Sequence, residues 1–258
     1  MAELFIERLN WPEVQAAVAA GRRRAIVCAA STEQHGPHLP EATDALLGAE
    51  YARRLAVRLG DALVAPVIRP GCSEHHMAFA GTITISPSLL MDVIDAYVAS
   101  LRRHGFTDFV VMSSHGGNYP ILADWAVARA TPGCVVISDA KVFDAGFEAL
   151  RRFGREDTAG PHAEVMETSM MLRLHPELVQ MERAAPGFEG DLKLPGLLER
   201  GMHAISANGI IGNPVGASAE IGEAVLDALA DRLADQVRTL QGRSGAPIVG
   251  GSTKGGGP

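Results

Sequence analysis

Two hydrophobic patterns alternate along most of the chain. Short, uninterrupted apolar runs are typical of strands buried on both faces, whereas apolar residues at every third or fourth position are typical of helices that bury one face. The apolar runs predict strands at residues 25–30, 63–67, 109–113 and 134–138, with a further short extended piece at 83–85. The segments between these runs have the helical pattern, so strands and helices are expected to alternate.

Residues that cap helices mark where several of the helical segments begin and end. Asn10 is suited to cap the first helix, and Ser86 followed by Pro87 is a typical start for another. Gly60 and Gly105 follow two helical segments as C-terminal stops. The helices are expected at residues 12–20, 43–59, 87–104, 119–130 and 218–240, and one more begins close to residue 162.

This order of elements predicts an α/β fold. Crossovers between parallel strands are almost always right-handed, which places helices on both faces of the sheet. We therefore expect a three-layer α/β/α sandwich around a mostly parallel sheet, formed by a single domain over residues 1–245. Residues 180–215 are expected to form a long irregular excursion, and the glycine-rich tail at 246–258 is expected to be disordered.

Composition and charge narrow the classes of function. The 258 residues are 47% hydrophobic and 21% charged, which is ordinary for a folded globular protein. The formal net charge is -7, aromatic residues make up 5%, and the basic residues cluster only at the three arginines of residues 22–24. Nucleic-acid binding, which needs a basic surface and stacking aromatic residues, is therefore not expected. A small or neutral substrate is the expected partner.

The cysteines and the N-terminus bear on the compartment. Cys28, Cys72 and Cys134 are an odd number without a C-x-x-C pair, which favours a reducing cytoplasm. The N-terminus lacks a basic region followed by an apolar one, and no apolar run reaches the roughly 18 residues that a membrane span needs, so neither export nor a membrane span is expected. Glycine-rich nucleotide-binding loops of the Rossmann or phosphate-loop type do not follow any predicted strand.

The segment after the first predicted strand carries the most informative polar residues. It reads S-T-E-Q-H-G-P-H-L-P at residues 31–40, with Asp44 just beyond. Glu33 and His35 are separated by one residue, a spacing that points both side chains the same way in an extended segment. Carboxylates and imidazoles are ligands for zinc, manganese or iron, and a carboxylate can bridge two ions. An exposed loop with a helix cap at Thr43 or Asp44 would explain these residues equally well.

A second polar segment, H-G-G-N, follows the predicted strand at 109–113. Because the carboxyl ends of parallel strands face a common crevice, His115 is expected near Glu33 and His35. Gly116 and Gly117 let the backbone approach a ligand, or adopt a turn that other residues avoid. A lone turn histidine beside geometrically required glycines remains the alternative.

Two further segments supply candidate site residues. His162 precedes a helix that contains Glu167, so His162 could serve as a proton carrier and Glu167 as a metal ligand or as a group that orients one. Glu164 is read as an acid in the favourable first turn of that helix. Ser73, Glu74 and His75 could line the pocket, or could be solvated loop. A nucleophilic cysteine or serine is less favoured, because none lies in a known activating motif.

Taken together, these segments resemble the creatininase family in order and spacing. The motifs are S-T-E-Q-H-G-P-H-L-P with T-D, then S-E-H-H-x-x-F-x-G-T, then S-H-G-G-N, and then H-A-x-x-x-E-T-S. The resemblance implies one or two divalent metal ions per subunit, of zinc, manganese or iron. It also implies a homo-oligomer, a hexamer or a trimer.

The resemblance assigns ligands to two ions. It implies that Glu33, Asp44 and His115 hold one ion, and that His35 and a bridging Asp44 hold the other. Glu167 is the candidate that completes the second site. Creatininase itself has a glutamate where this chain has Gly117, which disfavours creatinine as the substrate. Ala80 and Glu164 also depart from the usual proline and glycine of the family, and both changes are expected to reshape the substrate pocket.

The resemblance therefore implies an enzyme that uses metal-activated water to hydrolyse a C–N amide bond in a cyclic amide, a formamide or a small peptide-like substrate. His162 would carry a proton to the departing nitrogen, and the backbone at Gly116 and Gly117 would hold the developing oxyanion. One alternative is a metal-dependent hydrolase or lyase acting on a non-amide carbonyl compound, such as a lactone or a cyclic ketone. Another is a non-catalytic metal-binding maturation factor.

Overall fold

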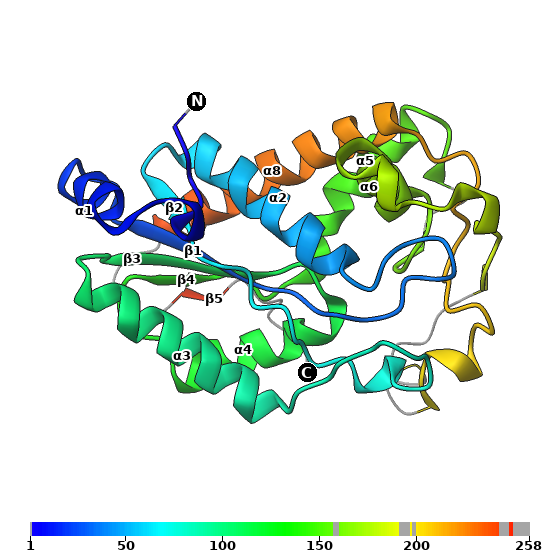
Figure 1. Ribbon diagram of the computed structural model, residues 1–258, viewed down its shortest axis with the longest axis horizontal. Helices are drawn as coiled ribbons and strands as arrows, with labels where there is room; N and C mark the ends of the chain where they lie inside the picture. Colours follow the sequence, from blue (N-terminus) through cyan, green and yellow to red (C-terminus); the bar gives the residue numbers. More distant parts are fainter. Residues whose placement is uncertain (1, 157–159, 191–196, 198–199, 243–247, 250–258) are drawn as a thin grey trace, which may run out of the picture.

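A five-stranded parallel sheet forms the centre of the computed structural model, which describes residues 2–156, 160–190, 197, 200–242 and 248–249 (Figure 1). The strand order is β2-β1-β3-β4-β5, and each neighbouring pair is parallel. The strands are β1 (Arg24–Ala29), β2 (Ala62–Val64), β3 (Asp108–Ser113), β4 (Cys134–Val136) and β5 (Ile248–Val249). The parallel sheet agrees with the expectation from sequence.

Helices cover both faces of this sheet and complete three layers. In Figure 1, α2, α8, α5 and α6 lie above the sheet, whereas α3 and α4 lie below it. Their bounds are α1 (Trp11–Ala19), α2 (Thr43–Leu59), α3 (Pro87–Arg103), α4 (Tyr119–Ala128), α5 (Asp144–Arg151), α6 (Val165–Leu174) and α8 (Ala219–Gln241). The α/β/α sandwich is confirmed. None of the helices in the described ranges is long and apolar enough to cross a membrane.

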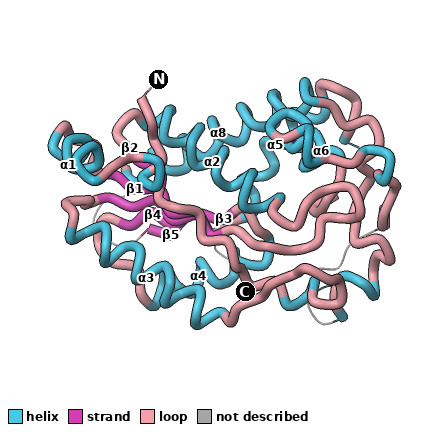
Figure 2. Tube along the Cα trace, viewed as in Figure 1, coloured by secondary structure: helices cyan, strands magenta, loops and turns pink. Residues whose placement is uncertain are grey.

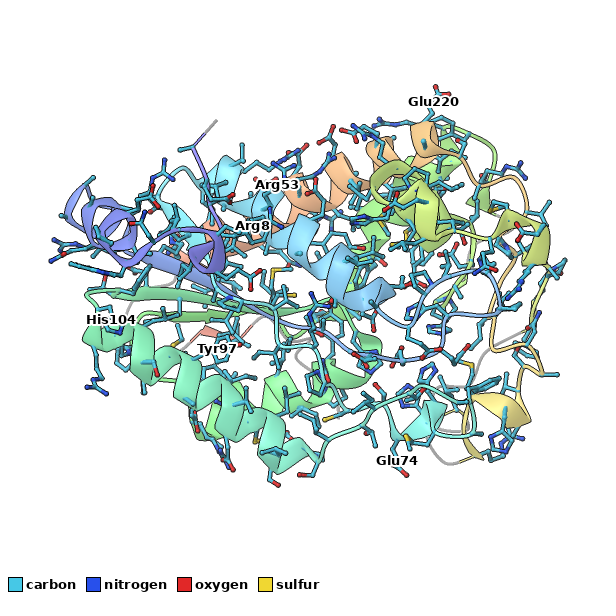
Figure 3. All side chains as sticks on the ribbon, in the orientation of Figure 1. Arg8, Arg53, Glu74, Tyr97, His104 and Glu220 are labelled. Carbon is cyan, nitrogen blue, oxygen red and sulfur yellow. The ribbon has the colours of Figure 1, made fainter. Side chains whose placement is uncertain are left out.

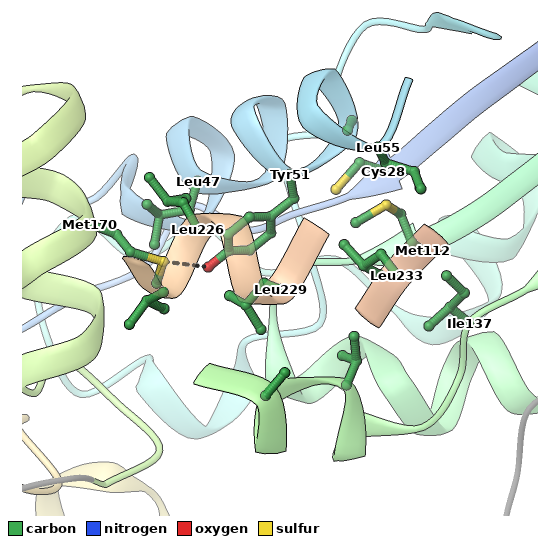
Figure 4. Close-up of a cluster of buried hydrophobic side chains, with 14 of the residues drawn as sticks. Cys28, Leu47, Tyr51, Leu55, Met112, Ile137, Met170, Leu226, Leu229 and Leu233 are labelled. Atoms are coloured by element: carbon green, nitrogen blue, oxygen red, sulfur yellow. Dashed lines mark hydrogen bonds between the residues drawn. The ribbon is translucent and has the colours of Figure 1, made fainter. Parts of the chain in front are cut away.

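Alternation along the strands divides the core into two layers. In β1, Ile26 and Cys28 belong to the cluster under α2 and α8, whereas Ala25 and Val27 belong to the cluster over α3 and α4. Figure 4 shows the first cluster, in which the Tyr51 hydroxyl donates to the Met170 sulfur at 3.3 Å. Burial on both faces explains why the strand sequences are continuously apolar.

Several predicted helix boundaries follow from observed caps. Asn10 caps α1 in a reciprocal capping box with Glu13, and the Ser86 side chain accepts from the Leu89 amide at the start of α3. Gly60 ends α2 in the left-handed conformation, at φ 81°. Cap chemistry is local, so the sequence is sufficient to find these ends.

The structure corrects the predicted start of the C-terminal tail. Ile248–Val249 form β5 and pair with Val135 and Val136 of β4, although the disordered tail was expected to begin at residue 246. The edge of β4 offers backbone groups with which a further strand can pair, and a segment of two residues is too short to show a strand pattern. The rest of the tail, 250–258, lies outside the described residues, as do parts of the predicted irregular excursion.

Candidate metal centre

Polar side chains gather where β1 and β3 end and α2 begins. The loop that follows β1 runs past the start of α2 toward α6 (Figure 2), carrying Glu33 and His35, while His115 follows β3. Asp44 lies in the first turn of α2. The four side chains come together deep inside the protein, since none of these residues is more than 3% exposed. Buried ionisable groups require partners, so their grouping calls for a chemical explanation.

Asp44 lies between the two histidines. Its Oδ2 is 3.2 Å from His115 Nδ1, and its Oδ1 is 3.4 Å from His35 Nε2. His115 Nδ1 also lies 3.1 Å from Glu33 Oε1. Each oxygen of Asp44 thus faces a different imidazole, which is the arrangement of a carboxylate that bridges two cations. Candidate ligand atoms of Glu33, His35 and Asp44 lie within 4.8 Å of one another.

Both histidines have one nitrogen occupied by a backbone carbonyl. His35 Nδ1 is 3.0 Å from the Glu33 carbonyl oxygen, and His115 Nε2 is 3.2 Å from the Cys72 carbonyl oxygen. Because a carbonyl only accepts, these nitrogens carry the proton in the neutral rings. The opposite nitrogens then present lone pairs to carboxylate oxygens, an arrangement that is repulsive unless a cation lies between them. Metal-binding histidines commonly have this second hydrogen bond.

The electrostatics of the cluster point to the same need for positive charge. Burial acts to lower the pKa of His35, but the carboxylates of Asp44 and Glu167 outweigh it and raise that pKa to about 10. Burial likewise opposes ionisation of Asp44, yet the adjacent histidines hold its pKa well below the ordinary value. The pocket therefore stabilises either protons or a metal ion.

Three buried atoms in this cluster have no hydrogen-bond partner: Glu33 Oε2, His35 Nε2 and Asp44 Oδ2. A buried polar atom left without a partner costs about 1–3 kcal/mol, and a charged group costs more. All three belong to residue types that bind zinc, manganese or iron. The residues present thus fit divalent ions. The burial of Glu33 and His35 argues against the alternative that this loop is exposed to solvent. The alternative role of Thr43 or Asp44 as a helix cap is not seen either, because α2 begins without a side-chain cap.

Glu167 and His162 approach this cluster from the start of α6. Glu167 Oε2 lies 3.8 Å from His35 Nε2. Candidate ligand atoms of His35, His162 and Glu167 lie within 4.8 Å of one another. Burial raises the pKa of Glu167 to about 7, against the opposing charge of His35. The intervening Ala163 has φ 56°, an unusual value for a non-glycine residue, and its amide donates to the Glu167 carboxylate. This turn holds both side chains toward β1.

Glu164 has the helix-start role that its sequence position suggests. Its carboxylate caps α6 by accepting from the Met166 and Glu167 amides. It is fully buried, and burial raises its pKa well above the ordinary value. Glu164 therefore caps the helix that carries Glu167.

The segment at 73–76 is only partly as predicted. Ser73 is buried, with Oγ 3.2 Å from His115 Nε2, and the ring of half-buried His75 stacks on His115 at 5.7 Å. Glu74 is exposed and points away from the protein (Figure 3), as in the alternative reading of this segment as solvated loop, and its place in a substrate pocket stays a prediction. The short 3-10 turn over Glu74–His76 directs His76 inward instead.

His76 is the site residue that the sequence reasoning missed. It is 2% exposed, and its Nε2 lies 3.4 Å from Glu33 Oε1. Adjacent histidines carry no periodic signal that tells which one faces inward. The apolar Phe79 that follows at i+3 was the available clue, because it packs in the same small cluster as Met202.

The two glycines after His115 have different surroundings. A Cβ at Gly117 would come within 2.4 Å of the Cys72 carbonyl oxygen and 2.5 Å of His115 Nε2. A Cβ at Gly116 would meet nothing within 4 Å. Gly117 therefore permits the close approach that places His115 against the Cys72 carbonyl.

Comparisons with known proteins agree on one family. The model described as "Creatininase: Creatinine amidohydrolase" matches residues 7–237. The mycofactocin precursor peptide peptidase of Mycobacterium tuberculosis (strain ATCC 25618 / H37Rv) is 35% identical over 216 residues, covering 78% of this chain and 79% of that protein. The creatinine amidohydrolase of Pseudomonas putida is 27% identical over 251 residues, covering 91% and 96%. A 3-dehydro-scyllo-inosose hydrolase of Thermotoga maritima is 27% identical over 241 residues, covering 84% and 78%.

Solved structures show the same likeness. A creatininase variant described as "Zn-Zn type" superposes with a TM-score of 0.73 at 27% identity, covering 93% of this chain and 98% of that one. A structure described as "Creatininase Mn" gives a TM-score of 0.72 at 27% identity, covering 92% and 98%.

Proposed function

This chain belongs to the creatininase family of metal-dependent amidohydrolases, and we propose that it hydrolyses the C–N amide bond of a small or peptide-like substrate. The observation that carries the proposal is the pair His35 and His115, each of which turns one ring nitrogen to a backbone carbonyl and the other to buried carboxylates. Such a site binds divalent cations, and a bound divalent ion supplies Lewis-acid polarisation of an amide carbonyl and of water.

The ligand set that the family resemblance implies is compatible with the distances within the cluster. Glu33, Asp44 and His115 would hold one ion, and His35, Asp44 and Glu167 would hold a second, with Asp44 shared. Zinc, manganese and iron all suit these oxygen and nitrogen donors. The likeness to creatininase structures described by zinc and by manganese supports the first two.

His162 is the proposed proton carrier. Its Nε2 lies 2.8 Å from the Gln34 carbonyl oxygen, so this nitrogen is protonated, and Nδ1 faces the cluster at 3.9 Å from Glu33 Oε1. Burial, reinforced by the charge of His35, lowers the pKa of His162 to about 3. A neutral ring at pH 7 can accept a proton at Nδ1 and pass it to the departing nitrogen. Glu167 is the second group expected to take part in proton transfer, and Gly116 and Gly117 remain the predicted backbone donors to the oxyanion.

The proposal also covers the class of substrate, the compartment and the oligomeric state. The relative named for a precursor peptide is 35% identical, which supports a peptide-like amide, whereas Gly117 in place of a glutamate argues against creatinine. We also expect a cytoplasmic homo-oligomer. The hydrolase relative named for 3-dehydro-scyllo-inosose supports a second candidate function, hydrolysis of a non-amide carbonyl compound.

Product analysis on metal-loaded and metal-free protein tests this function. Short peptides, formamides and small cyclic amides are incubated with protein loaded with Zn²⁺, Mn²⁺ or Fe²⁺, and with protein stripped by a chelator. We expect equal amounts of amine and acid from at least one amide class, loss of turnover on stripping, and recovery on reloading. Full activity in stripped protein would contradict the proposal, and turnover of lactones or cyclic ketones alone would favour the second function.

A further inference from the structure

The side-chain amide of Gln34 is held in one orientation. The Gly36 amide donates to Gln34 Oε1 at 2.8 Å, and Gln34 Nε2 donates to the Gly209 carbonyl oxygen at 3.1 Å. A backbone N–H only donates and a carbonyl only accepts, so exchanging the amide oxygen and nitrogen would break both bonds. Gln34 is 4% exposed, and solvent does not offer substitute partners.

One hydrogen of the Gln34 amide remains for a nearby imidazole. His162 Nε2 is 3.1 Å from Gln34 Nε2, but it is also 2.8 Å from the Gln34 backbone carbonyl, to which it must donate. His162 Nε2 therefore has no lone pair for the amide. The remaining hydrogen goes to His76 Nδ1, at 3.0 Å.

This leaves the proton of neutral His76 on Nε2. That nitrogen lies 3.4 Å from Glu33 Oε1, so His76 presents a donor to a carboxylate. His162 has the same tautomer but faces Glu33 through Nδ1, at 3.9 Å, and presents a lone pair. The two rings lie 4.7 Å apart and offer opposite chemistry because they approach the site through different nitrogens.

We propose that Gln34 is a positioning residue that fixes the tautomer of His76, so that the protonated Nε2 of His76 faces the Glu33 carboxylate. The inference rests on the proposed function for its effect on turnover, and on hydrogen bonding alone for the tautomer. The tautomer of His76 also bears on which of the three groups of candidate ligand residues can hold an ion; these groups are Glu33, His76 and His162; His35, His162 and Glu167; and Glu33, His35 and Asp44. The set of Glu33, His76 and His162 does not hold an ion through His76 Nε2, because that nitrogen carries a hydrogen.

The backbone packed against the amide supports this role. Gly209 has φ 77°, and a Cβ there would lie 2.0 Å from Gln34 Oε1. Only glycine lets the loop reach the amide so closely. Asn208 orders the same loop by accepting from the Ile210 amide at 3.2 Å and from the Ser206 hydroxyl at 2.8 Å. A residue far along the chain thus locks the orientation on which the His76 tautomer depends.

Nitrogen-15 NMR of histidine-labelled, Zn²⁺-loaded protein tests the inference directly. Two-bond proton–nitrogen spectra report which ring nitrogen is protonated, and His76→Ala and His162→Ala identify the signals. We expect protonated Nε2 on both rings in the natural protein. In Gln34→Met, which keeps the length but removes the amide, His76 should become a mixture of tautomers while His162 stays unchanged.

Measuring kcat, KM and zinc content distinguishes a positioning role from a general disturbance of packing, which would not lower kcat alone. Gln34→Met should lower kcat by about 10–100-fold, the usual range for residues that orient ligands, with KM and zinc content within about twofold. His104→Ala, an exposed histidine at the end of α3 (Figure 3), is the matched control and should match the natural protein.

Protonated Nδ1 on His76 in the natural protein would overturn the inference, whether or not Gln34→Met folds. An unchanged tautomer and unchanged kcat in a folded Gln34→Met would overturn it as well. The predicted tautomers in a protein that hydrolyses no amide would uphold the role of Gln34 in orienting His76 and reject the proposed function.

Discussion

His35 and His115 set the chemistry of the site at the scale of single residues, because each ring gives one nitrogen to a backbone carbonyl. Cys72 and Glu33 supply those carbonyls, so the backbone determines which nitrogen faces the carboxylates. His162 differs, since its free nitrogen lies beyond hydrogen-bond distance from Glu33. We propose that the histidines of this cluster divide into ligands and a proton carrier according to how closely their second nitrogen approaches a carboxylate.

Replacing these histidines one at a time tests this division. His115→Ala should reduce bound metal and turnover together, because it removes a ligand that faces both Glu33 and Asp44. His162→Ala should retain metal and lower kcat by about 10²–10⁴-fold, the range that a general acid–base group contributes. Elemental analysis of each variant beside its kcat, with His104→Ala as the control, makes the measurement. Loss of metal in His162→Ala would reassign that residue as a ligand.

Side-chain chemistry was predictable at some positions and not at others. Glu33, His35 and His115 could be predicted because strand ends converge in a parallel sheet, and Asp44 because it begins the helix that follows the same segment. His76 and Gln34 could not, since the inward direction of His76 depends on a 3-10 turn, and the contacts of Gln34 depend on a loop at residues 206–211. Such contacts between distant segments leave no pattern in the local sequence.

At the scale of elements, α6 carries Glu167 to the site, the turn before it carries His162, and α6 is itself held by α8. The Ser218 amide donates to Ser169 Oγ at 3.1 Å where the two helices meet. Gly222 of α8 lies against α6, because a Cβ there would come 2.0 Å from the Ser169 carbonyl oxygen. The close approach of these helices requires the glycine.

Gly222→Ala distinguishes this contact from ordinary helix propensity. Propensity alone would stabilise α8 by about 1 kcal/mol, whereas overpacking against backbone should destabilise the protein by about 1–3 kcal/mol. Denaturant unfolding measures the change in the free energy of unfolding. Thr239→Ala, an exposed change in the same helix, should stay within about 0.5 kcal/mol of the natural protein. A more stable Gly222→Ala would show that the helices do not pack so closely.

The length of an element decided how well the sequence predicted it. Helices α2, α3 and α8 are long, with strong apolar periods, and were predicted close to their observed bounds. Helix α5 was not predicted, because it has eight residues and buries mainly small ones. Strand β5 has two residues and no period of its own, and its place comes from the open edge of β4.

At the scale of the whole molecule, the sheet brings residues from distant parts of the chain to one buried centre. Strands β1 and β3 are neighbours and pair over their full length, which sets Glu33 and His35 beside His115. Helices pack on both faces of the sheet and form one hydrophobic core layer on each face (Figure 1). The α/β architecture could be predicted from alternation along the chain, since a segment with a helical period follows each of β1, β2 and β3.

Anomalous X-ray diffraction from crystals grown with Zn²⁺ tests the central claim most directly. We predict an anomalous peak at about 2.0–2.3 Å from Glu33, Asp44 and His115, the usual distance for zinc with oxygen and nitrogen ligands, and its loss in crystals of His115→Ala. Zinc-soaked crystals in which these side chains keep their mutual contacts and no peak lies among them would contradict the account.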